Sequence, residues 1–404
     1  MGMIVSFLLT ACNSKDSFPQ LTHIPCKVSD SDLWGMVGVD GKILFENEFE
    51  NEPSIAVNGV FSVLNSNDEL EYFTADSKPK QIGQKAYLDG GYYTEGVIPV
   101  VDSNHQILFI TKEGDIAFDL KEVKGKKVIN VSPLFSDGLM AFCTEDNKWG
   151  YINNKGKVVI EPVYSFANEF NEGYAVVATT RKIEQFPYSE ETAYVIDKKG
   201  NKIITLPKSK SDPVMEKFVY DECINWNHTM FNVNGKDSFS NPNVFVFNYQ
   251  DGYAPFVETD ENENIYQGKK FGIIDQKGSF IIRAKYDGIS RVIGNKFWAK
   301  QQTSDNNFNI DCLDKEGNKL FTIKNIKNFY PFSKNSILIQ EDNETYYFVN
   351  EKGQKENPQT FYTARLPLSF FADNYPLAAP NPFLSYTTPR VYPHYFVQTD
   401  NPLW

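Results

Sequence analysis

A short turn phrase recurs along this chain and constrains its fold more than any other feature. Its clearest copies are residues 152–157, 196–201, 274–279, 313–318 and 349–354. In each copy Asp or Asn opens the turn, and Gly follows three residues later. The Asp or Asn side chain can accept a backbone N–H group, and Gly can adopt a positive φ before the return strand. The phrase therefore predicts a tight β-hairpin.

The turn glycines mark a repeat along most of the chain. They are Gly41, Gly114, Gly156, Gly200, Gly278, Gly317 and Gly353. Most gaps between them are about 40 residues, and two gaps are about twice as long. Degenerate turns at 75–78 and 233–236 divide the two long gaps. Repeats of this length are typical of propellers and solenoids, and we expect nine units between residues 30 and 356.

Each unit also carries further recurring residues around its turn. An apolar residue stands seven positions before the turn glycine, and the best cases are Trp34, Trp149 and Phe271, followed directly by Gly35, Gly150 and Gly272. An acidic residue followed by Gly opens an earlier strand, as at Glu95, Asp137, Glu172 and Asp251. Three or four short strands per unit, separated by turns, predict an all-β fold of tandem antiparallel hairpins or meanders.

The unit around Trp149 resembles a WG (KWG) repeat. Residues 148–162 read KWGYINNKGKVVIEP, and residues 170–175 read FNEGYA. The resemblance covers about four fifths of the chain; it is strong around Trp149, good near Trp34 and Phe271, and weaker elsewhere. It implies a bacterial, often lipid-anchored, all-β repeat protein, and it transfers no catalytic residue.

One hairpin of this size is only marginally stable in water. The aromatic side chains of each unit must therefore be buried against the next unit. The aromatic residue at a fixed register favours packing over ligand stacking, and the Gly after it allows a close approach. A propeller-like ring is favoured, and a curved solenoid stays possible.

The N-terminus resembles a lipoprotein signal. Residues 3–9 are apolar, and Leu9-Thr10-Ala11-Cys12 resembles a lipobox whose Cys12 would carry the lipid. No Lys or Arg precedes the apolar run, so this segment could be truncated. We expect a signal segment at 1–12, a tether at 13–29, the repeat array at 30–356 and a distinct segment at 357–404, with a bacterial cell-envelope location on the outer-membrane or periplasmic face.

Two units carry insertions at the same point, 181–191 and 258–268, between the acid-Gly strand and the aromatic strand. Insertions that share a position emerge on one face, which is often the binding face. The second insertion contains Asp260, Asn262 and Asn264 in a spacing like the start of a calcium loop. Residue 265 is not Gly, so a solvated acidic loop is the favoured interpretation.

The segment 357–404 differs from the array because it holds 8 of the 21 prolines together with many aromatic residues. Proline resists both helices and central strands, but so many rings should not remain in water. Two interpretations stay open: a strap packed on the last units, or a docking arm for a partner.

Motifs for catalysis or cofactors are absent from the sequence. The four histidines are never at ligand spacing, the cysteines form no C-x-x-C pair, and no phosphate-binding or nucleophile motif occurs. A net charge of −12 argues against nucleic-acid binding. We therefore expect no cofactor and no metal, and a lipid-anchored scaffold that binds an unidentified protein or glycan. The alternative is a propeller-type hydrolase acting on glycans.

Overall fold

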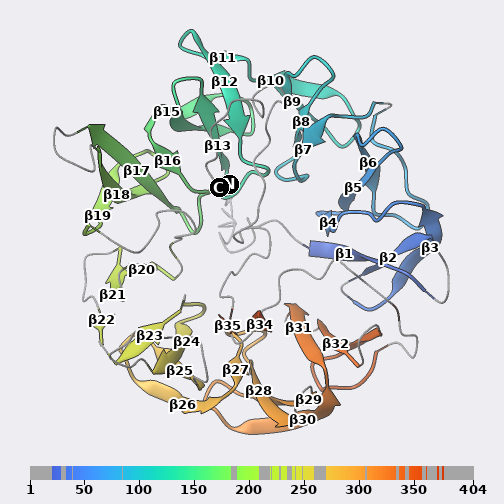
Figure 1. Cartoon of the computed structure of the whole chain (residues 1–404), viewed down its shortest axis with the longest axis vertical. Coiled ribbons are helices and arrows are strands. Elements are labelled where there is room, and N and C mark those ends of the chain that lie inside the picture. The colour runs from blue at the N-terminus through green and yellow to red at the C-terminus, as the bar shows by residue number, and fades with distance from the viewer. Residues whose placement is uncertain are drawn as a thin grey trace, which may run out of the picture.

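The chain forms a ring of nine blades in a computed structural model, and the first two blades share one six-stranded sheet (Figure 1). The structure describes residues 21–28, 33–38, 40–83, 85–182, 189–208, 219, 221–226, 229–233, 239–241, 243–247, 249–258, 270–304, 307–333, 336–341, 345–356, 361, 371–372 and 375–376. These residues contain strands and no helix, so the predicted all-β fold is confirmed.

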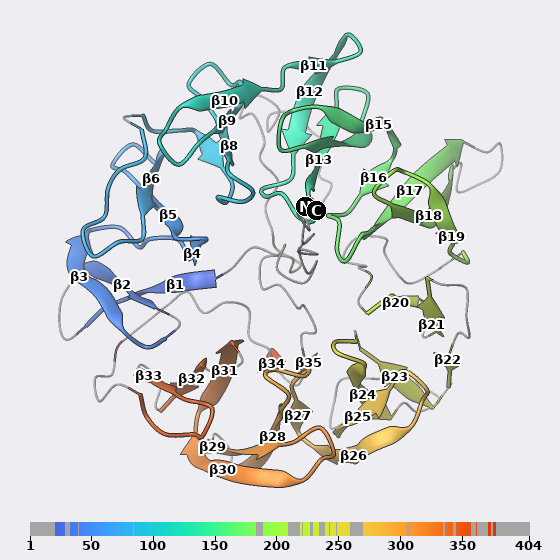
Figure 2. The same cartoon turned by 180° about the vertical axis from the view of Figure 1, so that it is seen from behind.

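The strands follow one another around the ring (Figures 1 and 2). Blades one to three contain β1 (Leu21–Cys26), β2 (Trp34–Gly38) and β3 (Ile43–Phe49); β4 (Ala56–Val57), β5 (Val60–Leu64) and β6 (Leu70–Thr74); and β7 (Asp89–Gly90), β8 (Ile98–Val101), β9 (Ile107–Ile110) and β10 (Ile116–Asp119). Blades four to six contain β11 (Glu122–Val123), β12 (Lys126–Val131), β13 (Leu139–Thr144), β14 (Lys148–Asn153) and β15 (Val158–Tyr164); β16 (Phe166–Ala167), β17 (Tyr174–Lys182), β18 (Ser189–Asp197) and β19 (Lys202–Thr205); and β20 (Cys223–Trp226), β21 (Thr229–Asn232) and β22 (Phe239–Ser240). Blades seven to nine contain β23 (Val244–Val246), β24 (Tyr253–Glu258), β25 (Phe271–Asp275) and β26 (Phe280–Tyr286); β27 (Gly288–Ile289), β28 (Phe297–Ser304), β29 (Asn307–Leu313) and β30 (Lys319–Ile326); and β31 (Asn328–Ser333), β32 (Ser336–Gln340) and β33 (Tyr346–Val349). A small hairpin, β34 (Phe371–Ala372) and β35 (Tyr375–Pro376), lies inside the ring (Figure 1).

In a complete four-stranded blade the first strand is innermost and the fourth is outermost, as in β16–β19 and β27–β30. All neighbouring strands within the blades pair antiparallel. Connections from first to second strand and from third to fourth strand therefore lie at one end of the ring, which we call the turn face. The other connections lie at the opposite end, which we call the loop face.

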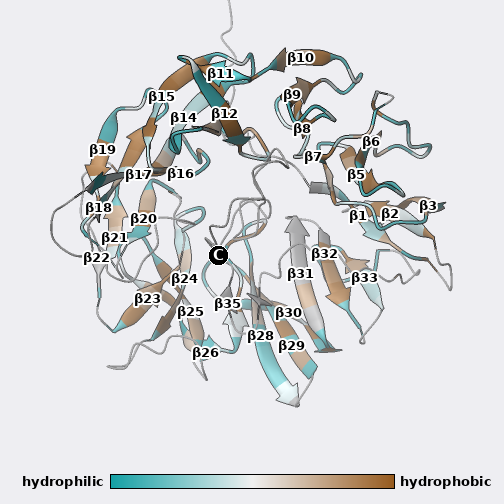
Figure 3. Ribbon diagram, turned by 45° about the horizontal axis from the view of Figure 1, so that its top comes forward, coloured by the Kyte–Doolittle hydropathy of each residue, from teal (hydrophilic) through white to brown (hydrophobic). Residues whose placement is uncertain are grey.

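The hydrophobic core is divided among the junctions between blades. The junction of blades four and five, for example, buries Tyr151 and Ile160 of one blade against Val177 and Ile196 of the next. Each of the nine junctions holds such a cluster of described residues. Figure 3 shows hydrophobic residues concentrated on the strands. Because side chains of a strand point alternately to its two faces, an apolar strand can serve both neighbouring junctions.

The ring is closed by contacts between its first and last blades. Ile24, Cys26 and Val37 of blade one pack with Leu338 and Phe348 of blade nine. This junction settles the choice between the two predicted arrangements in favour of a closed, propeller-like ring.

Two predicted boundaries differ from the structure. The tether was expected to run to residue 29, but β1 lies within it and pairs with β2 along His23–Cys26. The array was expected to end at residue 356, but Phe361 still pairs with Tyr346 of blade nine. β1 was not predicted because no acid-Gly step precedes it, whereas Phe361 belongs to the chain that returns after the last turn phrase at 349–354.

Candidate functional site

The repeated hairpin turns lie on the turn face and are built as the sequence predicts. Asp197 Oδ1 accepts backbone N–H groups of Lys199 (2.9 Å) and Asn201 (2.8 Å). Asn153 accepts the same two bonds in its own turn. Hydrogen bonds from Asn318 and from backbone amides hold the pKa of Asp314 below its ordinary value. Hairpin geometry thus accounts for the acidic residues at these turns.

The acid-Gly steps form a chain of hydrogen bonds from blade to blade on the same face. Glu95 Oε1 accepts the N–H of Gly138 (2.6 Å), and Asp137 accepts the N–H of Gly173. Glu172 Oε2 accepts the N–H of Asp221 (2.6 Å), which opens the equivalent turn of blade six with Glu222 in place of the Gly. Both residues of these turns have positive φ, for example 50° at Glu95 and 92° at Gly96, which is typical of type I′ hairpins. Burial raises the pKa of Glu95, which the bond from Gly138 only partly offsets.

Hairpin-turn side chains bind the same acid-Gly turns from the neighbouring blade. Asn154 Nδ2 donates to the carbonyl of Glu95 (3.3 Å). Lys198 lies 3.5 Å from Asp137, and Gln276 Nε2 donates to the carbonyl of Asp221 (3.1 Å). At these three places, polar side chains of the turn face join neighbouring blades.

The glycines of the Trp-Gly steps lie where the outermost strand bends toward the third strand. A Cβ atom on Gly150 would lie 2.5 Å from the carbonyl oxygen of Ile160. The corresponding contacts are 2.3 Å from Phe45 at Gly35 and 2.3 Å from Ile282 at Gly272. β14 pairs with β15 through a bulge at this point, which brings the backbone close.

The other predicted repeat residues lie at equivalent corners of their blades. Phe271 and Trp34 are buried, and Trp149 is half-buried. The turn glycines all have positive φ, between 75° and 89°, at Gly41, Gly114, Gly156, Gly200, Gly278, Gly317 and Gly353. These residues serve the hairpins and the junctions, and they do not converge on a pocket. Cys12 lies outside the described residues.

The loop face carries features that do not repeat. The first predicted insertion continues a long hairpin, because Thr180 pairs with Glu191 and Arg181 with Glu190 at the ends of β17 and β18. The second insertion follows the end of β24 at Glu258, and the rest of it, with the candidate calcium loop, lies outside the described residues. Both insertions connect a second to a third strand, and the described strand ends that flank them lie on the loop face.

A further hairpin on this face was missed by the sequence analysis. β11 pairs with β12 through a two-residue turn at Lys124 and Gly125, whose φ values are 53° and 73°. None of the other described blades carries an additional strand before its innermost strand. Four lysines lie in the seven residues 121–127. The available sequence signal was Gly125 between two short stretches that each contain Val, because a two-residue hairpin turn requires positive φ.

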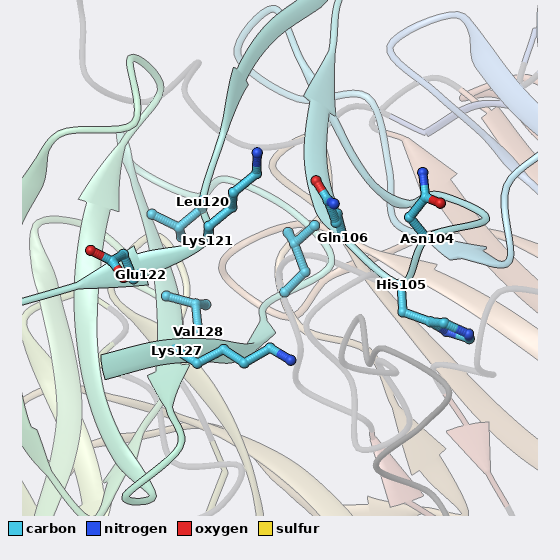
Figure 4. Close-up of a pocket in the computed structure, with 9 residues that line it drawn as sticks. Asn104, His105, Gln106, Leu120, Lys121, Glu122, Lys127 and Val128 are labelled. Atoms are coloured by element: carbon cyan, nitrogen blue, oxygen red, sulfur yellow. The ribbon is translucent and has the colours of Figure 1, made fainter. Parts of the chain in front are cut away.

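A pocket of about 430 Å³ lies at the base of this hairpin, between blades three and four (Figure 4). Ile107, Leu120 and Val128 form a buried apolar floor. Its other lining residues are polar: Asn104, His105, Gln106, Lys121, Glu122 and Lys127. Lys121 forms an exposed ion pair of 3.0 Å with Asp119. The pocket thus combines an apolar base with cationic and amide groups, which suits recognition of a ligand with both polar and apolar parts.

Metal-ligand clusters and cysteines bear on the catalytic motifs considered in the sequence, within the described residues. They contain no group of three or more His, Cys, Asp or Glu side chains arranged to hold a metal ion. Four cysteines among the described residues, Cys26, Cys143, Cys223 and Cys312, are buried and form no disulfide with one another. Burial raises the pKa of Cys223 and of Cys312 to about 12, so their thiolate forms are scarce near neutral pH.

Two segments of the chain, 149–179 and 271–302, match the family described as WG containing repeat. These two segments are therefore similar to WG repeats. They coincide with the third and fourth strands of blades four and seven and the strands that follow. No curated protein matches the chain by sequence. The described residues include no apolar helix of membrane-spanning length.

Solved structures resemble this ring at low sequence identity. A crystal structure titled as the eukaryotic initiation factor has a TM-score of 0.54 at 11% identity, over 85% of this chain and 98% of that chain. Apo AztD from Citrobacter koseri has a TM-score of 0.36 at 10% identity, over 84% and 96%. BamB from Moraxella catarrhalis has a TM-score of 0.32 at 11% identity, over 85% and 99%. The first of these likenesses supports the fold alone.

Proposed function

We propose that this protein is a non-catalytic binding scaffold of the cell envelope, which recognises a protein or a glycan through its loop face. The contrast between the two faces carries the proposal. Polar groups of the turn face bind neighbouring blades, whereas the loop face bears the β11–β12 hairpin, the long β17–β18 hairpin and the pocket. Features that depart from a repeat are often where repeat proteins bind their ligands.

A binding screen with two charge-reversal variants tests the loop face. Purified protein is screened on an array of neutral, uronic-acid and sulfated glycans and in pull-downs from envelope protein extracts. We expect the double variant Lys121→Glu, Lys127→Glu to weaken binding to the captured ligand about tenfold or more, because each reversed charge alters the pocket. The double variant Lys155→Glu, Lys277→Glu changes the turn face by the same charge and should bind normally.

Two outcomes would count against this proposal. One is equal loss of binding in both double variants, since the ligand would then not distinguish the faces. The other is turnover of an array glycan by the wild-type protein, which would support the hydrolase alternative.

We further propose that the protein is held at a bacterial membrane by a lipid on Cys12. β1 begins at Leu21, so nine residue steps separate Cys12 from the ring. A fully extended chain of that length spans about 30 Å. The anchor would therefore keep the ring close to the membrane surface, with acyl chains supplying the affinity.

Cell fractionation tests the anchor. We expect Cys12→Ala to move the protein from the membrane fraction to the soluble fraction, because the thiol that accepts the lipid is lost. Ser14→Ala, two residues away, should leave it in the membrane fraction. Persistence of the Cys12→Ala variant with membranes would contradict lipid anchoring.

A further inference from the structure

The β11–β12 hairpin has a backbone edge with which no described strand pairs. Glu122 of β11 faces Lys127 of β12, and one position further from the turn the N–H of Val128 donates to the carbonyl of Lys121 (2.9 Å). Hydrogen-bonded and non-hydrogen-bonded pairs alternate along an antiparallel ladder, so Glu122 and Lys127 form a non-hydrogen-bonded pair. The N–H and the carbonyl of Glu122 therefore point away from β12. The carbonyl of Lys127 likewise points away from β11, since it accepts the N–H of Glu145 (2.8 Å).

This edge of β11 is accessible to another molecule. Glu122 is exposed, and so are Lys121 and Lys124, which flank the strand. The tip of the hairpin lies at the outer margin of the ring (Figures 1 and 2). Unpaired N–H and carbonyl groups at the edge of a sheet are the groups to which a strand of another chain adds.

Two adjacent pockets lie beside β11. One is the pocket of about 430 Å³ described above, and the other, of about 580 Å³, is lined on its blade-four side by Val158 and Glu161. Leu120, Lys121 and Glu122 line both pockets. Side chains of an extended peptide alternate in direction along its backbone. Neighbouring pockets at a free edge can therefore each receive one of them.

The floors of both pockets are apolar. Leu120 and Val128 are buried in the first pocket, and in the second Val123 is buried and Val158 is half-buried. Each floor favours an apolar side chain of the ligand. A sugar chain lacks the regularly spaced N–H and carbonyl groups that pair with a strand edge, so the combination of edge and pockets favours a peptide.

The charges around the edge favour acidic residues in that peptide. Residues 121–127 contain four lysines and one acidic residue, in a protein of net charge −12. Three of these lysines form exposed ion pairs: Lys121 with Asp119, Lys124 with Glu161, and Lys126 with Asp146. Exposed ion pairs contribute little to stability, so carboxylates of a ligand can replace the present partners at low cost.

We propose, on the basis of the loop-face binding inferred above, that the ligand is an extended, acidic peptide segment of a partner protein that adds to the free edge of β11 as a strand. The N–H and the carbonyl of Glu122 pair with the peptide backbone and supply affinity. The two pockets select apolar side chains, and the lysines of the hairpin bind the acidic residues between or beside them.

Two substitutions at Glu122 test the strand addition. The probe is a displayed library of random linear peptides of about 12 residues, which span about 40 Å as a strand. Peptides enriched on the wild-type protein are synthesised and titrated against the full-length chain by fluorescence anisotropy. Glu122→Ala removes the side chain and keeps the backbone N–H, whereas Glu122→Pro removes both. We expect Glu122→Pro to bind at least about tenfold more weakly than Glu122→Ala, because a ladder hydrogen bond is lost and the proline ring occupies the edge.

Amide exchange gives a second readout at the same residue. Binding of an enriched peptide should slow exchange at the amide of Glu122 and leave that of Gly125, in the turn, unchanged. The hairpin should tolerate the proline, because the N–H of Glu122 does not point to β12. Thermal midpoints of the Glu122→Ala and Glu122→Pro variants within about 2 °C of each other would verify that both are folded alike.

Equal affinities of the two Glu122 variants, unchanged exchange at Glu122, or the enrichment of no peptide would each overturn the strand addition. A glycan that binds the wild-type protein and is lost in the Lys121→Glu, Lys127→Glu variant would do the same, while supporting the binding role of the loop face. Peptides and glycans that both bind this double variant normally would contradict the loop-face function as well.

Discussion

Replacing Phe348 by Ala is expected to lower the free energy of unfolding by about 3–5 kcal/mol, the usual cost of removing a buried Phe side chain. Phe348 is 1% exposed and lies in the junction that joins blade nine to blade one. Its ring stacks on that of Phe361 with centroids 5.7 Å apart. Urea denaturation followed by tryptophan fluorescence measures the change.

Phe109 provides the matched comparison for this prediction. It occupies the same position of its blade, two residues after Ile107, as Phe348 does after Tyr346. It is also fully buried, in the junction of blades three and four. In a closed ring Phe109→Ala and Phe348→Ala should cost similar amounts. A loss for Phe348→Ala below half of that for Phe109→Ala would indicate an open junction and contradict closure.

Replacing Gly150 by Ala is expected to cost about 3 kcal/mol, at the upper end of the range for overpacking. The added Cβ would lie 2.5 Å from the carbonyl oxygen of Ile160 and 2.7 Å from the nitrogen of Pro162. Both are backbone atoms, so no side-chain rotation relieves the contact. The measurement is again urea denaturation, together with amide exchange in β14 and β15 to locate the disturbance.

Gly173→Ala separates this steric effect from backbone conformation. Gly173 has a φ of 88°, and a Cβ there would meet nothing within 4 Å. Its substitution should cost about 1 kcal/mol, from the left-handed conformation alone. Equal losses at Gly150 and Gly173 would mean that the close backbone approach is not what requires glycine after the tryptophan.

The sequence carried enough information to predict the strands, because hairpin chemistry is local. An Asp or Asn that accepts two backbone N–H groups, followed by Gly at positive φ, defines each turn within six residues. The apolar residue at fixed spacing then sets the register of the strand before it. The number of units, nine, could be counted from these local patterns. The same patterns place both insertions between the second and the third strand of their units.

Features that depend on contacts between distant residues could not be predicted. Closure rests on Val37 meeting Leu338, and neither residue differs from apolar residues in other strands. β1 escaped detection because no turn phrase of the repeat precedes it. The acid-Gly step was recognised as the start of a strand, but its partner, the next blade's turn, is about 40 residues away, as for Glu95 and Gly138. The pocket beside β11 and β12 is lined by residues of two different blades, so no local sequence pattern marks it.

The junction of the first and last blades has a consequence for the order in which the protein folds. Val37 and Leu338 are about 300 residues apart, whereas every other junction joins blades that are neighbours in sequence. During synthesis, eight junctions can form as each new blade emerges, but the ninth must wait until the chain is almost complete. Until then Ile24 and Cys26 lack their packing partners from blade nine. The exposed apolar surface of one unfinished chain could then bind that of another. A chaperone that shields this early surface would therefore favour rings over aggregates.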